Sequence, residues 1–281
     1  MRLASSGPTI PPMSRALVEA LSSSAPIEEL ALRFARDAYP MLRPEPILRR
    51  FDEMAAAIAP RIEGERELRS IALTIGEHLH DELQLRGNEV DYHDPRNSYL
   101  HEVLERRVGL PITLAAVWLA VGRRLGVHVD GIGFPGHFLV RVGKERGVLV
   151  DPFREGRLVT QAEIERLATH HLGSVERLRA EHLAPVDTRS MLVRMLVNLK
   201  HAYERRADHA RALVVCDRLV DLTGAPTFRR DRGLHAMALG ASAAALEDLD
   251  AYLDAGAPEG DADSVRASRD RLLAATKRRL S

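Results

Sequence analysis

The side chains best suited to chemistry are a histidine and an aspartate on two neighbouring strand-like runs. His137 begins the run HFLVRV, and Asp151 ends the run VLVD. A carboxylate that accepts a hydrogen bond from an imidazole fixes the tautomer and the orientation of the ring, which can then act as a general base in acyl transfer. These residue types indicate a site for making or breaking a peptide or amide bond, provided that the fold brings them together.

A predicted β-hairpin would bring them together. Side chains alternate between the two faces of a strand, so His137 and Leu139 share one face. If Val142 pairs with Val148 across the intervening turn, an antiparallel register places Leu139 opposite Asp151. His137 is then diagonal to Asp151 on the same face, about 7–8 Å away at Cα, which is within reach of a side-chain hydrogen bond.

A long apolar helix predicted over 112–125 would supply the position of a nucleophile. It follows Gly109-Leu110-Pro111, where the proline suits the first helical position, and it is apolar almost all round, so we expect it to be buried centrally. A thiol in its first turn would have a pKa lowered by the helix dipole. The single cysteine is Cys216, far along the chain. Thr113 offers a hydroxyl, which is hard to ionise without a strong base beside it.

Other elements follow from apolar periodicity and from breaking residues. Helices are predicted over 27–37, 47–58 and 68–83, strands over 127–133, 137–142 and 148–151, and a further helix after the capping box at 160–163. Gly87 is suited to cap the third helix, and Asn97 or Ser98 to cap a helix over 99–107.

Four short motifs in the central region resemble one known family. They are Asn97-Ser98-Tyr99-Leu100, Gly109-Leu110-Pro111-Ile112, Phe134-Pro135-Gly136-His137-Phe138 and Asp151-Pro152-Phe153. In this order they are similar to motifs of the transglutaminase-like superfamily, and specifically of its bacterial SirB-type branch. The resemblance implies an α+β, predominantly helical fold, with a papain-like core, a small antiparallel sheet and an all-helical repeat-like region after it.

The resemblance also implies the layout of the site. Active members of the superfamily carry a cysteine at the start of the central helix, a histidine on the following strand and an aspartate on the next. His137 and Asp151 match the last two as a remnant catalytic pair, whereas the helix start has no cysteine, as is common in the branch. The motif residues expected around this cleft are Asn97, Ser98, Tyr99, Pro111, Phe134, Gly136 and Phe153.

Composition divides the chain into three parts. Residues 1–25 are rich in Ser and Pro and predict a flexible tail without a secretory signal, 26–185 form the transglutaminase-like core with its helical N-terminal segment, and 186–281 are wholly helical. In this last part Gly224-Ala225-Pro226 recurs as Gly256-Ala257-Pro258. The period is near that of a helix-turn-helix repeat and suggests two degenerate tetratricopeptide-like units, with a simple helical cap as the alternative.

Composition also narrows the function. Forty basic and forty acidic residues cancel, so we expect no nucleic-acid partner, and no apolar run is long enough for a membrane span. One cysteine excludes an internal disulfide and fits the cytoplasm; no cofactor loop and no full metal-ligand set is present. We expect a non-catalytic module that binds a protein or peptide through the cleft and the C-terminal helices, or has a regulatory role. The alternative is a hydrolase or acyltransferase that uses His137 and Asp151 on peptide or amide bonds.

Overall fold

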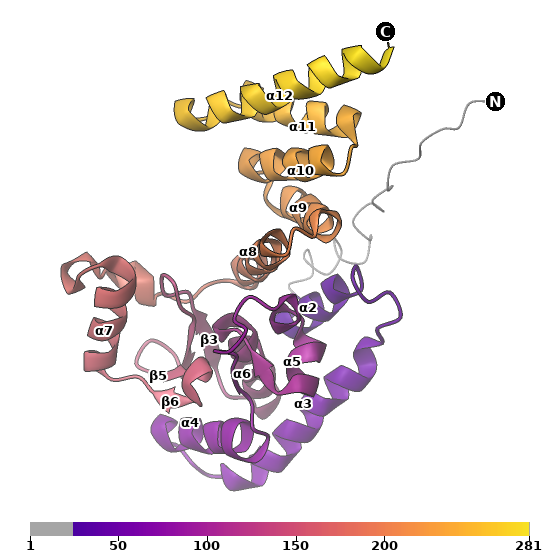
Figure 1. Ribbon diagram of the computed structural model, residues 1–281. Coiled ribbons are helices and arrows are strands. Elements are labelled where there is room, and N and C mark those ends of the chain that lie inside the picture. Colours follow the sequence, from indigo (N-terminus) through magenta and orange to yellow (C-terminus); the bar gives the residue numbers. More distant parts are fainter. Residues whose placement is uncertain (1–24, 281) are drawn as a thin grey trace. The chain divides into compact units, whose positions relative to one another are not determined.

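The computed structural model describes the backbone of residues 25–280 and the side chains of residues 25–276 (Figure 1). The predicted tail over 1–25 lies outside the described residues except for Ala25. Of the described residues, 25–195 form one compact unit and 196–280 form another. We call them the core unit and the repeat unit.

A buried helix, α6, lies at the centre of the core unit (Figure 1). It packs against other helices and against strands β3 and β4, so its sides all face protein, as its sequence predicted. Its indole Trp118 is buried and donates a hydrogen bond to His80 Nε2 at 3.0 Å. The α-helices of the core unit are α2 (Ile27–Ala35), α3 (Pro44–Ile58), α4 (Leu68–Gly76), α5 (Leu100–Arg106), α6 (Pro111–Leu125) and α7 (Gln161–Leu172).

A four-stranded antiparallel sheet packs on α6 and has the strand order β3-β4-β5-β6. Its strands are β3 (Val129–Ile132), β4 (Leu139–Val142), β5 (Val148–Asp151) and β6 (Arg157–Leu158). Val142 pairs with Val148, which confirms the predicted register of the hairpin. A second, parallel sheet pairs β1 (Arg86–Gly87) with β2 (Val108–Gly109). It was not predicted, because two-residue strands leave no alternation to detect.

Two predicted helix caps are wrong. Gly87 lies in β1, and the left-handed position after the third helix is taken by Gln84, with φ 59°. A glycine is needed at position 87 for another reason, since a Cβ there would lie 2.6 Å from the Phe153 ring. Neither Asn97 nor Ser98 caps α5, whose N-cap is Tyr99 without a side-chain bond.

Short helical turns complete the core unit. The third predicted helix continues beyond α4 as a π-helical turn, and 3-10 turns precede α5 and follow β5. These turns are η1 (Ala59–Arg61), η2 (Glu77–Glu82), η3 (Pro95–Ser98), η4 (Pro152–Arg154), η5 (Val175–Arg177) and η6 (Ala180–Leu183).

Helices alone build the described part of the repeat unit (Figure 1). They are the second half of α8 (Thr188–Arg205), then α9 (His209–Thr223), α10 (Pro226–Ala238), α11 (Ser242–Asp254) and α12 (Glu259–Leu280). Gly224 ends α9 at φ 65° and Gly256 follows α11 at φ 82°, each just before a proline at the next helix start. The recurring Gly-Ala-Pro is therefore one helix-turn-helix junction used twice, and the predicted fold class is confirmed.

Candidate functional site

The hairpin brings the predicted histidine and aspartate into contact. His137 Nε2 lies 2.8 Å from Asp151 Oδ2, and both side chains are more than 90% buried. A carboxylate can only accept a hydrogen bond, so a neutral His137 ring must carry its proton on Nε2 and keep Nδ1 unprotonated. The basic nitrogen is thereby directed away from the aspartate.

The Asp151 carboxylate is fixed by the chain that follows it. Its Oδ1 accepts hydrogen bonds from the backbone N–H of Phe153 at 3.0 Å and of Arg154 at 3.3 Å, which leaves Oδ2 for the imidazole. Asp151 therefore caps the short turn η4 in the way that aspartate commonly caps a helical start. The Asp-Pro-Phe motif accounts for both bonds, because proline has no N–H and the donors begin one residue later.

A tight turn presents His137 two residues before β4 begins at Leu139. The N–H of His137 donates to the carbonyl of Phe134 at 3.0 Å, with Pro135 and Gly136 between them. Gly136 has φ +69°, and proline followed by a left-handed glycine is the sequence pattern of a type II turn. Phe134 is fully buried and anchors the turn in the core.

An arginine of α8 binds the same turn through hydrogen bonds to two of its carbonyls. Arg194 Nη2 donates to the carbonyls of His137 at 3.1 Å and Phe134 at 3.3 Å, and its guanidinium lies over the Phe138 ring, 5.0 Å from the centroid. A Cβ at Gly133 would lie 2.5 Å from Arg194 Nη1, so the glycine leaves room for this contact. Burial lowers the pKa of Arg194. We did not predict this residue, because nothing in the pattern of a helical arginine far along the chain indicates its target.

A cavity of about 540 Å³ opens beside His137. Pro111, the first residue of α6, lines it together with Phe153 and Tyr92. The Phe153 ring meets the imidazole of His137 edge-on, with centroids 6.1 Å apart. The start of the central helix and the histidine thus face one cavity, and the residue at that start is a chemically inert proline.

A second histidine, His171 of α7, covers the turn. Its ring lies nearly parallel to that of His137, with centroids 6.3 Å apart, and a Cβ at Gly136 would lie 2.2 Å from its Nδ1. Burial lowers the pKa of His171, and the neighbouring His170 and His137 lower it further. His171 is therefore neutral at pH 7. The sequence pattern of α7 does not indicate that this histidine lies beside His137.

The threonine, serine and cysteine side chains named in the sequence analysis do not line this cavity. Thr113 is fully buried and ties two segments together: its Oγ1 accepts from the N–H of Leu110 at 2.9 Å and lies 2.8 Å from the Asn97 carbonyl oxygen, to which it donates. Ser98 is buried, and its hydroxyl has no hydrogen-bond partner among the described residues. Cys216 is buried within α9 of the repeat unit, where desolvation raises the pKa of its thiol.

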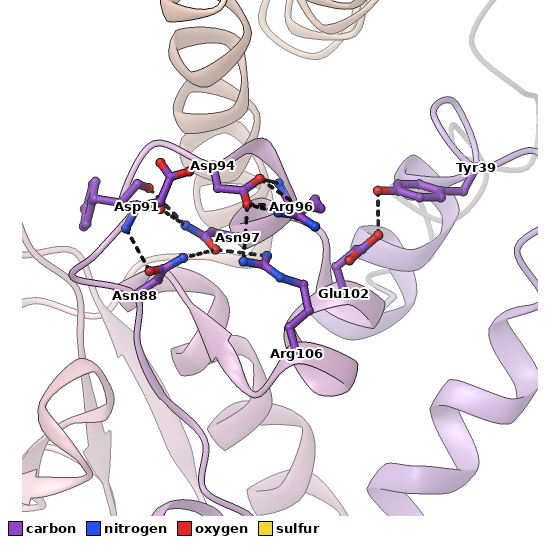
Figure 2. Close-up of polar contacts among 9 residues, drawn as sticks. Tyr39, Asn88, Asp91, Asp94, Arg96, Asn97, Glu102 and Arg106 are labelled. Atoms are coloured by element: carbon purple, nitrogen blue, oxygen red, sulfur yellow. Dashed lines mark hydrogen bonds and ion pairs between the residues drawn. The ribbon is translucent and has the colours of Figure 1, made fainter.

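The Asn97 side chain holds the loop over residues 88–94, which lines one side of the cavity (Figure 2). Its Oδ1 accepts from Asn88 Nδ2 at 3.0 Å and from Arg106 Nη1 at 3.2 Å. Its Nδ2 donates to the carbonyls of Asp91 at 2.7 Å and Tyr92 at 3.2 Å. Through its own carbonyl, which accepts from Thr113, the same residue fastens this loop to the first turn of α6.

Asp94 supports the loop from the other side (Figure 2). Its carboxylate bonds Arg96 at 2.7 Å and lies 3.3 Å from Arg106 Nη2. Burial alone would raise the pKa of Asp94, but the hydrogen bonds from Arg96 and the charge of Arg106 outweigh it and hold the pKa at about 2. The Asn-Ser-Tyr-Leu motif predicted Asn97 but not Asn88 or Arg106, whose roles depend on contacts outside the motif.

Two other kinds of site are absent from residues 25–280. No group of three His, Cys, Asp or Glu side chains is close enough together to hold a metal ion. None of the helices there combines the length and the apolar character needed to cross a bilayer.

Comparison with known proteins gives two family matches. The family model of the transglutaminase-like superfamily matches residues 45–197, and that of a tetratricopeptide repeat matches residues 199–272. The chain is 38% identical over 250 residues to a protein of Xylella fastidiosa strain Temecula1 named UPF0162 protein, covering 86% of this chain and 88% of that one. A protein of the same name from Vibrio cholerae is 31% identical over 179 residues, which is 63% of this chain and 66% of that one.

A eukaryotic relative matches about half of the chain. F-box only protein 21 of Mus musculus is 37% identical over 145 residues, which is 48% of this chain and 22% of that protein. No solved structure matches the chain.

Proposed function

Because the chain belongs to the transglutaminase-like superfamily, we propose that it is a member without covalent chemistry, whose cleft binds a segment of a protein partner. The tetratricopeptide-like helices would offer a second surface to the same or another protein. The observation that carries the proposal is the cavity beside His137, where a proline takes the place at the head of α6.

Among the described residues that line the cavity there is no cysteine, serine or threonine. Proline has no side-chain hydroxyl, thiol or amine, and the Thr113 proton is held by the Asn97 carbonyl. Cys216 is buried in the repeat unit, and a buried free cysteine behaves as a small apolar residue. His137 and Asp151 would then serve to position a ligand, since an oriented imidazole also donates and accepts hydrogen bonds without catalysing a reaction.

The buried His137–Asp151 contact favours one second function, hydrolysis by an activated water. In it, His137 Nδ1 would take a proton from a water that attacks an amide carbonyl, while Asp151 stabilises the charged ring, and His137 would return that proton to the leaving amine as the C–N bond breaks. General-base assistance contributes roughly 10²–10⁴-fold, so His137→Ala would abolish nearly all such turnover.

The substitution Pro111→Cys tests both functions. A thiol at the first position of α6 would have a pKa lowered by the helix dipole and by a protonated His137, so iodoacetamide should alkylate it much faster than Cys216. We expect wild-type protein to show only background hydrolysis of p-nitrophenyl acetate, Pro111→Cys to exceed it, and Pro111→Cys with His137→Ala to lose most of the gain.

Two results would contradict the proposal. Wild-type turnover that disappears in His137→Ala would make the chain an enzyme and favour the water mechanism. If the thiol introduced by Pro111→Cys is no more reactive than one introduced at an exposed position by His93→Cys, the head of α6 is not the vacated nucleophile position.

A further inference from the structure

A second cavity adjoins the one beside His137. This second cavity, of about 610 Å³, lies between β1 and the turn η4. The two cavities share three lining residues, Glu89, Phe153 and Arg154. We call these two adjoining cavities together the groove. Each half is of a size that pockets for small ligands commonly have, so the groove is large enough for an extended segment rather than a single small molecule.

Positive charge dominates the groove. Four arginines line it, Arg86, Arg154, Arg157 and Arg166, against two glutamates, Glu89 and Glu155. The whole chain is neutral, so this excess is a local feature and not part of a general field. The N-terminus of α6, which begins at Pro111 in the groove, adds the positive end of a helix dipole.

The arginines differ in how far they are already neutralised. Arg157 pairs with Glu155 at 3.3 Å, and Arg166 pairs with Glu163 at 3.2 Å. Arg154 is half exposed and lies 3.9 Å from an Asp151 oxygen that is already bonded to His137. Arg86 is exposed and forms no ion pair with any residue of the described range. Arg86 and Arg154 are therefore the two charges most available to a ligand.

Apolar side chains accompany these charges. Val90 is 99% exposed and Tyr92 is 39% exposed, and both border the groove on the loop that Asn97 holds. A ligand with both carboxylates and apolar side chains satisfies this lining. The two glutamates repel any polyanion, and they oppose an unbroken chain of phosphates more than a segment that places apolar side chains against Val90 and Tyr92 between its carboxylates. The lining therefore favours a peptide over RNA.

We propose that the groove recognises an extended peptide segment rich in Asp or Glu, with Arg86 and Arg154 as its principal contacts. This inference rests on the proposed function, since it names the chemistry of the segment that the cleft would bind. The carboxylates of the segment would pair with the two guanidinium groups, and its chain would run past Phe153 toward His137.

The test measures binding of a fluorescein-labelled oligoglutamate peptide to the full chain by fluorescence anisotropy. Charge reversal at one exposed contact should weaken binding about fivefold, so we expect this loss for Arg86→Glu and for Arg154→Glu, and about twenty-fivefold for the double variant. Arg69→Glu, an exposed arginine of α4 outside the groove, is the matched control and should bind as wild type. Raising the ionic strength should weaken binding by the wild type.

The outcomes separate the inference from its alternatives. Equal binding by the wild type and the double variant, or an equal loss in Arg69→Glu, would overturn the groove as the site. Tighter binding of an oligouridylate of the same charge would overturn the choice of a peptide. Arg86→Gln and Arg154→Gln should each give a smaller loss than the charge reversal at the same position, and unchanged circular dichroism would exclude misfolding as the cause.

Failure of the proposed function is distinguishable from failure of this inference. If wild-type protein hydrolyses an ester in a His137-dependent manner yet binds oligoglutamate through Arg86 and Arg154, the groove is a substrate site of an enzyme. If it neither hydrolyses the ester nor binds oligoglutamate, the non-catalytic proposal stands and the acidic segment is wrong.

Discussion

The core unit and the repeat unit bury polar side chains in different ways. In the core unit, Asn97, Thr113 and Asp151 bond mainly to backbone N–H and C=O groups of nearby loops. In the repeat unit, charged side chains of one helix bond those of another, as Lys200 of α8 bonds Asp231 of α10 at 2.5 Å. Polar groups thus mostly fix the course of irregular chain in the first unit, where the buried Glu28 of α2, paired with Arg123 and Arg124 of α6, is an exception. In the second unit they join regular helices.

This difference matches what each unit needs. Loops around a cavity have backbone groups that no neighbouring helix or strand satisfies, and a buried amide or carboxylate can satisfy two or three of them. Helices satisfy their own backbone, so buried polarity there can serve only side-chain pairing between helices. Such pairs need partners of opposite charge, because an unpaired buried charge is costly.

The largest effect is expected from breaking an interhelical pair in the repeat unit. Arg232 of α10 binds Asp248 of α11 through two bonds of 2.7 Å and Asp217 of α9 at 2.5 Å. Arg232→Met leaves the buried Asp248 carboxylate without its partner, which should lower the free energy of unfolding by about 3 kcal/mol. Urea denaturation followed by circular dichroism measures this loss.

An exposed pair in the same unit provides the control. Arg266 bonds Asp263 at 2.9 Å with both side chains more than half exposed, so Arg266→Met should cost well under about 1 kcal/mol. Equal losses in the two variants would show that the charged pairs do not join the helices.

A smaller loss, about 2 kcal/mol, is expected from Asn97→Ala in the core unit. The substitution removes a partner from the buried Asn88 amide and from the part-buried carbonyls of Asp91 and Tyr92. Amide hydrogen exchange should rise across residues 88–94, because the loop loses its anchor. Asn97→Asp should also destabilise, since a carboxylate cannot donate to the two carbonyls. His93→Ala, exposed on the same loop, should leave exchange unchanged; slow exchange in Asn97→Ala would contradict the anchoring role.

The smallest effect is expected from His101 of the core unit, a buried polar side chain that bonds neither backbone nor another side chain among the described residues. His101 is buried, packs edge-on against Tyr39 with centroids 4.4 Å apart, and neither ring nitrogen has a hydrogen-bond partner among the described residues. Burial lowers the pKa of His101 from its ordinary value of 6.5. The folded state therefore binds fewer protons than the unfolded state, and the stability that the neutral ring retains above pH 6.5 is lost as the pH falls below it.

His101→Phe removes this proton linkage. The variant should lose less stability than the wild type between about pH 7.5 and about pH 5.5, by up to about 1 kcal/mol. Urea midpoints at the two pH values measure the difference, with His93→Gln, an exposed histidine, as the control. If the variant and the wild type lose the same stability between the two pH values, His101 does not contribute to the loss of stability in acid.

The parts of the fold that could be predicted from the sequence are those whose residues follow a regular local pattern. The hairpin register could be predicted, because alternation over 137–142 and a short turn leave one pairing that shares a face between His137 and Asp151. The buried α6 could be predicted, because its sequence is apolar almost all round. The recurring Gly-Ala-Pro indicated the paired helices of the repeat unit, which a family match now supports.

Contacts between distant segments could not be predicted. Gly87 was predicted to be a cap, whereas its lack of a side chain makes room for Phe153, which lies far along the chain. Arg194 and His171 reach the His137 turn from helices whose sequences carry no sign of that target. Ser98 was expected at a helix cap, but the chain is already turned there by Pro95 and Asn97, and the hydroxyl is left buried.

The position of Arg194 has a consequence for dissecting the chain into fragments. Composition suggested a division after Pro185, but Pro185 bridges to Ile132 of β3, and the N–H of Val186 bonds the Gly131 carbonyl at 2.9 Å. A proteolytic or recombinant cut there would strip β3 of an edge partner and remove the guanidinium that grips the His137 carbonyl. A gene fusion that keeps the cavity intact must therefore include the first turns of α8 with the core unit, although the second half of this helix belongs to the repeat unit.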